Sequence, residues 1–163
     1  MKITLRRALL VAFALVLLAG FGCGKQQSSI TPDGYDQDAP MTAEEMAVAQ
    51  QISDAVIYFA YDRYDLSTQS QNVLQQKAGI IRQYPQLSVV IEGHCDERGT
   101  QEYNLALGER RARAAYDYLI MLGVNASQME LISFGKERPA EGGSGEGVWG
   151  KNRRDEFRVI SGR

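Results

Sequence analysis

Nine residues near the middle of the chain, EGHCDERGT at 92–100, concentrate side chains that can do chemistry. They include the only histidine, His94, one of the two cysteines, Cys95, and the acidic residue Asp96. Adjacent side chains of an extended segment point to opposite sides, so His94 is badly placed to act as a base for Cys95. Four consecutive residues also converge poorly on a metal ion, and no second cluster completes a coordination shell. We therefore interpret the stretch as a cradle for a charged ligand, with no catalytic residue, metal or cofactor.

The segment that follows supplies a second charged group. Asn104, Gly108 and Arg111 are spaced by four and three, so they share one face of a helix, which is expected to border the core without entering it. Glycine in a helix interior costs about 1 kcal/mol relative to alanine, which indicates a close approach at Gly108. For Arg111 a solvated or salt-bridged helix arginine stays the alternative. The helix is expected over 102–122, with an apolar stripe of Leu105, Ala112, Ala115, Leu119 and Leu122 and a stop at Gly123.

The rest of the hydrophobic pattern alternates between strand and helix. Apolar, β-branched runs predict strands at 55–59, 87–93, 129–135 and 156–160, and helical spacing predicts a further helix over 67–84. The order β-α-β-α-β-β favours an α/β fold of two layers, with the helices on one face of a mixed sheet. The stretch at 92–100 then leaves the second strand, at a sheet edge where ligands tend to bind.

A glycine-rich segment at 142–152 resembles a phosphate-binding loop. Gly145, Gly147 and Gly150 fit G-x-G-x-x-G, and residues 145–152 fit the P-loop pattern except that Asn152 replaces serine or threonine. Both motifs need a strand before the glycines and a helix after them. Because a strand is expected to follow, we interpret this segment as a surface loop.

The N-terminus has the features of a secretion signal. Three basic residues precede an apolar run at 8–19, which is shorter than the roughly 20 residues of a membrane-spanning helix. The following GFGC resembles the lipobox of bacterial lipoproteins, although Gly20 stands where leucine is usual. We expect a signal peptide at 1–22 and lipidation of Cys23, with a soluble secreted protein as the alternative. Lipidated Cys23 would leave Cys95 without a disulfide partner.

The mature chain is expected to be acidic and to divide into a linker and a domain. Removing residues 1–22 takes away three basic side chains and no acidic one, so the net charge changes from −2 to −5. That balance argues against a nucleic-acid binder. Residues 23–51 are mostly polar and read as a flexible linker, which ends in a short helix opened by a capping box of Thr42 and Glu45. Residues 52–163 are expected to form the domain.

Several motifs together carry a family resemblance. EGHCDERGTQEYNLALGERRA at 92–112 resembles the G-H-x-D and N-x-x-L-x-x-x-R-A signature of OmpA-like peptidoglycan-binding domains. IYFAYDRYDL at 57–66, ISFGKERPA at 132–140 and KNRRDEFRV at 151–159 are similar to the lipoprotein branch of that family. The resemblance implies an OmpA-like fold that binds the meso-diaminopimelate of peptidoglycan without covalent bonds.

The resemblance also implies roles for individual residues. Asp96 would accept from the ligand's ammonium, Arg111 would present a planar fork to its carboxylate, and Asp62 would lie near the ligand. His94, Asn104 and Gly108 would support the loop. This sequence departs from the family pattern at three positions: Cys95 for threonine or alanine, Gly108 for serine, and Ala60 for aspartate.

The implied function is a non-catalytic tether. It would be a lipoprotein of the outer membrane that faces the periplasm, binds peptidoglycan, and belongs to the Tol-Pal system through the periplasmic protein TolB, supporting envelope integrity and cell division. Gly24, and not aspartate, follows Cys23, which by resemblance to enterobacterial lipoprotein sorting favours the outer membrane. One alternative is a peptidoglycan-binding accessory module of another envelope machine, such as a motor stator. Another is a cell-wall hydrolase, which Asp96 beside Arg111 disfavours, because that pairing lowers the carboxyl pKa.

Overall fold

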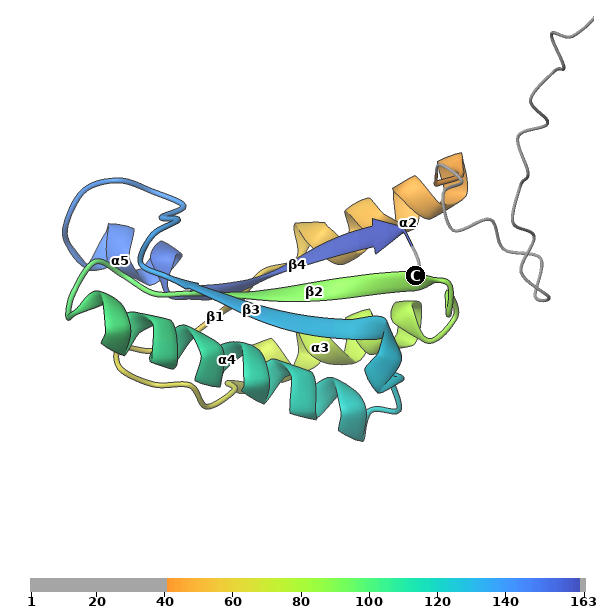
Figure 1. The fold of residues 1–163 in the computed structure, drawn as a ribbon, viewed down its shortest axis with the longest axis horizontal. Helices are drawn as coiled ribbons and strands as arrows, with labels where there is room; N and C mark the ends of the chain where they lie inside the picture. Colours follow the sequence, from red (N-terminus) through yellow and green to blue (C-terminus); the bar gives the residue numbers. More distant parts are fainter. Residues whose placement is uncertain (1–40, 162–163) are drawn as a thin grey trace, which may run out of the picture. The chain divides into compact units, whose positions relative to one another are not determined.

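The fold is organised around β2 (Leu87–His94), a central strand of a four-stranded mixed sheet (Figure 1). The computed structural model describes residues 41–161. The sheet order is β1 (Ile57–Tyr58), β4 (Arg154–Ser161), β2 and β3 (Met129–Gly135). β3 runs parallel to β2, and β4 runs antiparallel to both β2 and β1. The predicted α/β class and the mixed sheet are confirmed.

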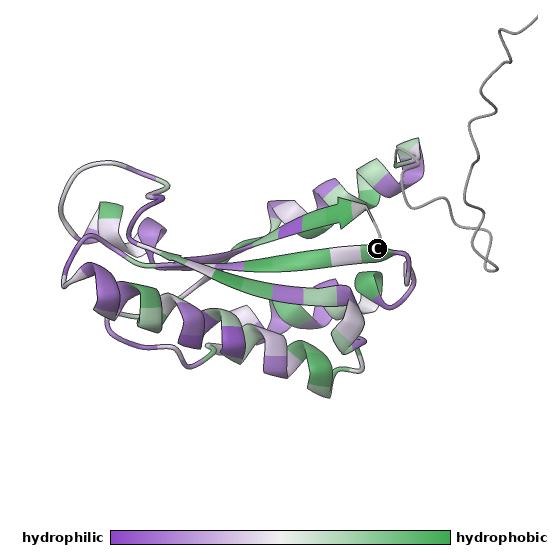
Figure 2. Cartoon of the chain, in the orientation of Figure 1, coloured by the Kyte–Doolittle hydropathy of each residue, from purple (hydrophilic) through white to green (hydrophobic). Residues whose placement is uncertain are grey.

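Two long helices cover one face of this sheet (Figure 1). They are α3 (Thr68–Ile81) and α4 (Gln101–Met121), and the short turn η1 (Ala126–Gln128) leads from α4 into β3. Alternate residues of β2, namely Leu87, Val89 and Ile91, point into the core between the layers. In Figure 2 the apolar middle of β2 gives way to polar residues toward the end of the sheet near α5 (Glu146–Asn152). The core therefore lies in the middle of the domain, and the polar groups gather at one end of the sheet.

Helix α2 (Ala43–Asp54) opens with the expected capping box and belongs to the packed domain. The Thr42 amide donates to Glu45 Oε2 at 2.8 Å, and the Glu45 amide donates to Thr42 Oγ1 at 3.2 Å. Val48 and Ile52, four residues apart on one face, are buried in the same core as the sheet and α3. The packed part of the chain thus begins before residue 52, within the segment expected to be linker. The signal peptide at 1–22 and Cys23 lie outside the described residues.

The interpretation of residues 142–152 as a loop is wrong in part, because Glu146–Asn152 form helix α5. Gly145 adopts a φ of 106°, which turns the chain, and its carbonyl accepts from the amides of Val148 and Trp149. Sequence reasoning missed the helix because Gly147 and Gly150 dilute its propensity. The glycines still lack the context of a P-loop, since the loop 136–145, and no strand, precedes α5.

Two predictions about α4 are wrong. Asn104, Gly108 and Arg111 are all buried, so the face that they share enters the core rather than bordering it. Leu105, expected in the apolar stripe, is 37% exposed, and Leu107 is buried in its place. The buried face of α4 is rotated relative to the prediction, because polar side chains take part in the packing at its N-terminal half.

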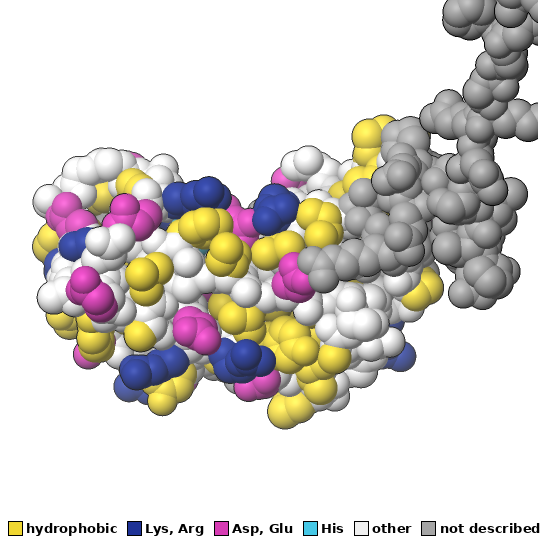
Figure 3. Space-filling model, viewed as in Figure 1, with side chains coloured by type: hydrophobic (Ala, Val, Ile, Leu, Met, Phe, Trp, Pro, Cys, Tyr) yellow, Lys and Arg dark blue, Asp and Glu magenta, His cyan; other side chains and the backbone are white. Residues whose placement is uncertain are grey.

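The described surface carries both signs of charge. On the face shown in Figure 3, basic side chains are interspersed with acidic ones. Within residues 41–161, no helix is both long and apolar enough to cross a membrane.

The close approach predicted at Gly108 is made by the sheet. A Cβ built on Gly108 would lie 2.4 Å from Ser133 Oγ and 3.0 Å from the Gly93 carbonyl oxygen. A Cβ on Gly93 would lie 2.1 Å from the Gly108 carbonyl oxygen, which is backbone and cannot rotate away. The paired glycines let α4 cross β2 at backbone contact, which places the first turns of α4 beside the end of β2.

Substituting Gly93 tests this crossing. We expect Gly93→Ala to lower the free energy of unfolding by about 3 kcal/mol, because the methyl group forces α4 away from β2. Gly79→Ala is the control, since Gly79 lies in α3 with nothing within 4 Å of the added Cβ, and we expect it to raise stability by up to about 1 kcal/mol. Urea denaturation followed by circular dichroism measures both. Equal stability of the two variants would contradict the crossing.

Candidate ligand-binding site

A pocket of about 60 Å³ opens beyond the end of β2. Three segments form it: the loop after β1, the loop after β2, and the first turns of α4. Its lining consists of Tyr61, Asp62, Cys95, Asp96, Arg98, Gly99, Tyr103, Asn104, Leu107 and Arg111. Four of the six residues expected at a ligand site therefore converge here, namely Asp62, Asp96, Asn104 and Arg111. His94 and Gly108 do not line the pocket.

Asp96 is 5% exposed and is held by two arginines. Its Oδ1 accepts from the amide of Arg98 at 3.1 Å and from Arg98 Nε at 3.0 Å. Its Oδ2 accepts from Arg98 Nη2 at 2.5 Å and from Arg153 Nη1 at 3.2 Å. Burial alone would raise the pKa of Asp96, but the hydrogen bonds from Arg98 and Arg153 outweigh it and the pKa is lowered. Asp96 is therefore an ionised acceptor at neutral pH.

Arg111 is 1% exposed, and the backbone holds its guanidinium. Nε donates to the Arg63 carbonyl at 2.9 Å, Nη1 donates to the His94 carbonyl at 2.9 Å, and Nη2 donates to the Ala60 carbonyl at 3.2 Å. Nη1 also lies 3.4 Å from Cys95 Sγ. Burial lowers the pKa of Arg111 from its ordinary value, yet the group keeps its charge. Arg111 thus joins the two pocket loops to α4, and the planar fork expected for a ligand carboxylate is already largely engaged.

Asp62 lies at the rim of the pocket. It is the one non-glycine residue of the described chain with a positive φ, at 54°, and its Oδ1 accepts a hydrogen bond from the hydroxyl of Tyr103 in α4. Both side chains are exposed. The carboxylate is therefore accessible to a ligand that takes the place of the tyrosine hydroxyl.

An aromatic clamp around Arg98 was not predicted from the sequence. The guanidinium carbon of Arg98 lies 3.9 Å from the ring centroid of Tyr61 and 4.1 Å from that of Trp149 in α5. Trp149 Nε1 donates to Glu97 Oε1 at 2.8 Å, which ties α5 to the same loop. The position of Arg98 two residues after Asp96 was the only local signal, because Tyr61 and Trp149 come from distant segments.

Asn104 and His94, which were expected to support the loop, and the neighbouring Cys95 have different surroundings. Asn104 is buried, and its Nδ2 donates to the Arg98 carbonyl at 2.8 Å, which is the contact of a loop-bracing residue. Cys95 is buried as well, and its Sγ donates to the Asn104 carbonyl at 3.3 Å. Burial raises the pKa of the Cys95 thiol to about 11, so the nucleophilic thiolate is scarce at neutral pH. His94 projects from the face of the sheet that α3 and α4 leave uncovered.

Comparison with known proteins identifies the family of this fold and pocket. The model described as OmpA family matches residues 58–153. The chain belongs to the OmpA family. It is 40% identical over 158 residues to the peptidoglycan-associated lipoprotein of Pseudomonas aeruginosa, covering 90% of this chain and 94% of the relative. It is 36% identical over 155 residues to the protein of the same name from Pasteurella multocida, covering 92% and 95%.

Solved structures of OmpA-family domains share the fold. The peptidoglycan-associated lipoprotein from Burkholderia pseudomallei aligns with a TM-score of 0.63 at 45% identity, covering 64% of this chain and 89% of that one. The C-terminal domain of Helicobacter pylori MotB aligns with a TM-score of 0.62 at 21% identity, covering 66% and 84%. The second likeness concerns the fold alone.

The environment of Arg111 generates a stability prediction for this OmpA-family domain. Arg111→Lys keeps the charge but cannot reach three carbonyls in two loops, so we expect it to lower the free energy of unfolding by about 2 to 3 kcal/mol. Arg110→Lys, at the exposed neighbouring position, should change it by less than about 0.5 kcal/mol. Thermal or urea denaturation measures the free energy of unfolding of both variants. Equal stability of the two variants would show that the carbonyl contacts of Arg111 contribute little.

Proposed function

We propose that this domain binds peptidoglycan without covalent bonds by recognising the free end of meso-diaminopimelate in the stem peptide. The observation that carries the proposal is the convergence of Asp62, Asp96 and Arg111 on one pocket of an OmpA-family domain. The free end of diaminopimelate carries an ammonium and a carboxylate on one carbon, so it needs an acceptor and a donor at close range. The relatives are named for an association with peptidoglycan.

The contacts of each side chain suggest how the ligand is held. Arg111 uses four of its five N–H groups within the protein, so it offers the ligand carboxylate a single N–H and its charge. Arg98, part-exposed at the pocket, is the second cation for that carboxylate. The ammonium is received by Asp62, whose bond to Tyr103 would be exchanged for one to the ligand. Asp96 contributes its buried negative charge, and a direct bond to it would replace one of the four that it accepts from Arg98 and Arg153. The pocket of about 60 Å³ would then widen at this rim.

We further propose that the protein is a tether in the envelope. Lipidation of Cys23, suggested by its lipobox-like setting, would anchor the chain in the outer membrane with the domain in the periplasm. One acyl chain gives only marginal membrane binding, so the anchor needs more than one, as the triacylated cysteine of bacterial lipoproteins provides. On the family resemblance of the sequence motifs, we also propose membership of the Tol-Pal system, with TolB as a partner, and a role in envelope integrity and cell division. The names of the relatives support the lipoprotein class and the association with peptidoglycan.

The chemistry of the site supports binding over catalysis. A lowered pKa makes Asp96 a poor general acid. The raised pKa of Cys95 makes it a poor nucleophile, and both groups are engaged by neighbouring residues. We expect purified sacculi incubated with the protein to release no soluble muropeptides, measured by chromatography of the supernatant. Release that Asp96→Asn abolishes would indicate a hydrolase instead.

Cosedimentation with sacculi tests the binding residues. Asp96→Asn should weaken binding at least about tenfold, because the ligand ammonium loses the buried negative charge that faces it. Asp62→Asn should weaken it by less, because that carboxylate is exposed. Asp65→Asn is the matched control, since Asp65 lies in the same loop, pairs with Arg63 and lies outside the pocket lining, and it should bind like the unchanged protein.

The identity of the ligand is tested with cell walls of a different stem-peptide composition. Walls that carry lysine in place of diaminopimelate present an ammonium without the neighbouring carboxylate, so binding to them should fall to the background. All variants are checked by circular dichroism in the same detergent buffer before sedimentation. If folded Asp96→Asn and Asp65→Asn sediment alike, the assignment of Asp96 is wrong. If lysine-containing walls bind equally well, the zwitterion is not the ligand.

A further inference from the structure

We propose that Glu92, His94 and Glu156 form a binding site for one divalent transition-metal ion, best matched by zinc, on the face of the sheet that α3 and α4 leave uncovered. The site is separate from the pocket beyond β2 and does not depend on the proposed function. Each residue offers one ligand atom, and these three atoms all lie within 4.8 Å of one another. Imidazole nitrogen and carboxylate oxygen are ligands that zinc accepts.

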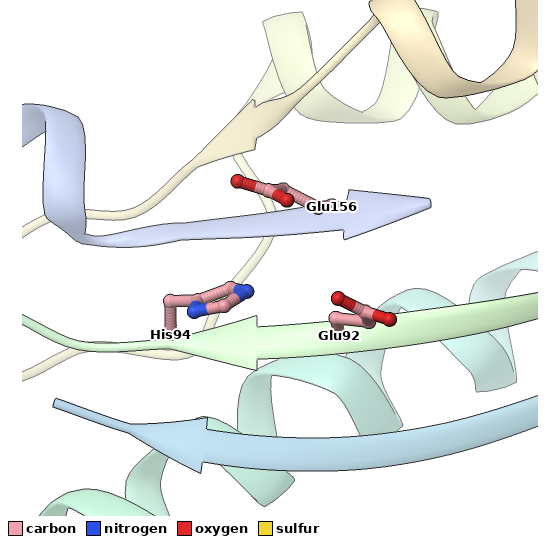
Figure 4. A group of neighbouring side chains, drawn as sticks. All are labelled: Glu92, His94 and Glu156. Atoms are coloured by element: carbon pink, nitrogen blue, oxygen red, sulfur yellow. The ribbon is translucent and has the colours of Figure 1, made fainter. Parts of the chain in front are cut away.

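The strand geometry brings the three side chains to one place (Figure 4). Glu92 and His94 are two residues apart on β2, so both project from the same face of the sheet. Glu156 on β4 is the antiparallel register partner of Glu92, directly across the ladder. Ligand atoms of a tetrahedral zinc site lie about 3.4 Å apart, given metal–ligand bonds of about 2.1 Å. Small rotations of the two carboxylate side chains are enough to reach that spacing.

His94 provides an independent reason to expect a ligand at this place. The ring is 1% exposed, and neither nitrogen makes a hydrogen bond of normal geometry within residues 41–161. Buried polar groups are almost always satisfied, so a histidine in this state needs a partner. Figure 4 shows one ring nitrogen facing the two carboxylates. A metal ion between them would satisfy that nitrogen.

The state of the ring suits a metal ligand. Zinc binds the neutral form of imidazole, which is the main form of an ordinary histidine at neutral pH. Phe134 stacks on the ring with centroids 5.5 Å apart and helps to fix its plane.

The charges around the site set the limits of its affinity. Glu92 and Glu156 face each other across the ladder, an arrangement of like charges that is unfavourable unless cations neutralise it. Arg158 Nε pairs with Oε1 of Glu92 at 2.7 Å, and Arg154 Nε pairs with Oε1 of Glu156 at 2.6 Å. Oε2 of each carboxylate takes no part in these pairs. The two arginines weaken the attraction for a cation, although Arg158, with a side chain 56% exposed, can turn toward solvent.

Access to the site is through Glu156. Its side chain is 41% exposed, whereas that of Glu92 is 8% exposed and the His94 residue is 1% exposed. Three protein ligands leave the fourth position of a tetrahedral ion open to water. The site is thus built to hold an exchangeable ion at the surface of the sheet, in contrast to the closed four-ligand sites that hold zinc for structure.

The sole histidine makes the test specific. The full-length protein, made without a histidine tag, is purified in detergent, stripped with a chelator and titrated with Zn²⁺. Competition with a chromophoric chelator should give one ion per chain, and the imidazole NMR signals, which belong to His94 alone, should shift and saturate at the same ratio. Mg²⁺ should leave these signals unchanged, because it prefers oxygen ligands.

Three variants decide between this site and other sources of zinc binding. Glu156→Gln removes one ligand at an accessible position and should weaken binding at least about tenfold. His94→Asn should weaken it further, and Glu137→Gln, in the exposed loop after β3, should bind like the unchanged protein. His94 signals that do not move at saturating Zn²⁺ would overturn the proposal. Equal binding by folded Glu156→Gln and Glu137→Gln would do the same, and would direct attention to the cysteine thiols.

Discussion

The buried guanidinium of Arg111 is the interaction on which the site depends. Its donors reach the carbonyls of Ala60, Arg63 and His94, so one side chain joins the loop after β1, the end of β2 and α4. Burying an arginine is costly unless its N–H groups are satisfied, and here backbone carbonyls supply the partners. The Gly93–Gly108 contact makes this geometry possible, because only backbone at that crossing lets α4 come close enough to β2. The pocket is thus a consequence of how the helix is seated on the sheet.

The fold followed from local patterns to a large extent. The strands and long helices were placed within a few residues, because β-branched runs, capping residues and the stop at Gly123 act over short distances. Helix α5 was missed because glycines mask its propensity, and the exposure of Leu105 was missed because a polar set, Asn104 and Arg111, takes the buried face of α4. A prediction of the buried helix face from hydrophobic periodicity assumes that buried residues are apolar. That assumption fails where polar side chains are buried, as they often are at functional sites.

The site residues, like the fold, could be predicted from the sequence only in part. Asp96 and Arg111 were named from a motif along the chain, but their immediate partners come from segments far away in sequence, such as Arg153 for Asp96 and Ala60 for Arg111. A metal site was rejected because His94 and its neighbours are consecutive. The antiparallel register then places Glu156 beside His94 and Glu92, a meeting that depends on strand order and could not be read from spacing. Linear motifs identify which residues matter, whereas the fold decides what each one touches.

The charge balance of the pocket bears on the kind of ligand it favours. Its charged lining consists of two cations, Arg98 and Arg111, and two anions, Asp62 and Asp96. A ligand with a net charge would leave one sign unbalanced in a poorly solvated space, which costs more there than in water. A zwitterion adds no net charge, and it can be oriented by the two cations and the two anions of the lining together. Arg153 is not part of the lining, and it pairs with both Asp96 and Glu146. Under the proposed function, the pocket would discriminate by the arrangement of opposite charges rather than by total charge, which is what separates the free end of diaminopimelate from an isolated ammonium.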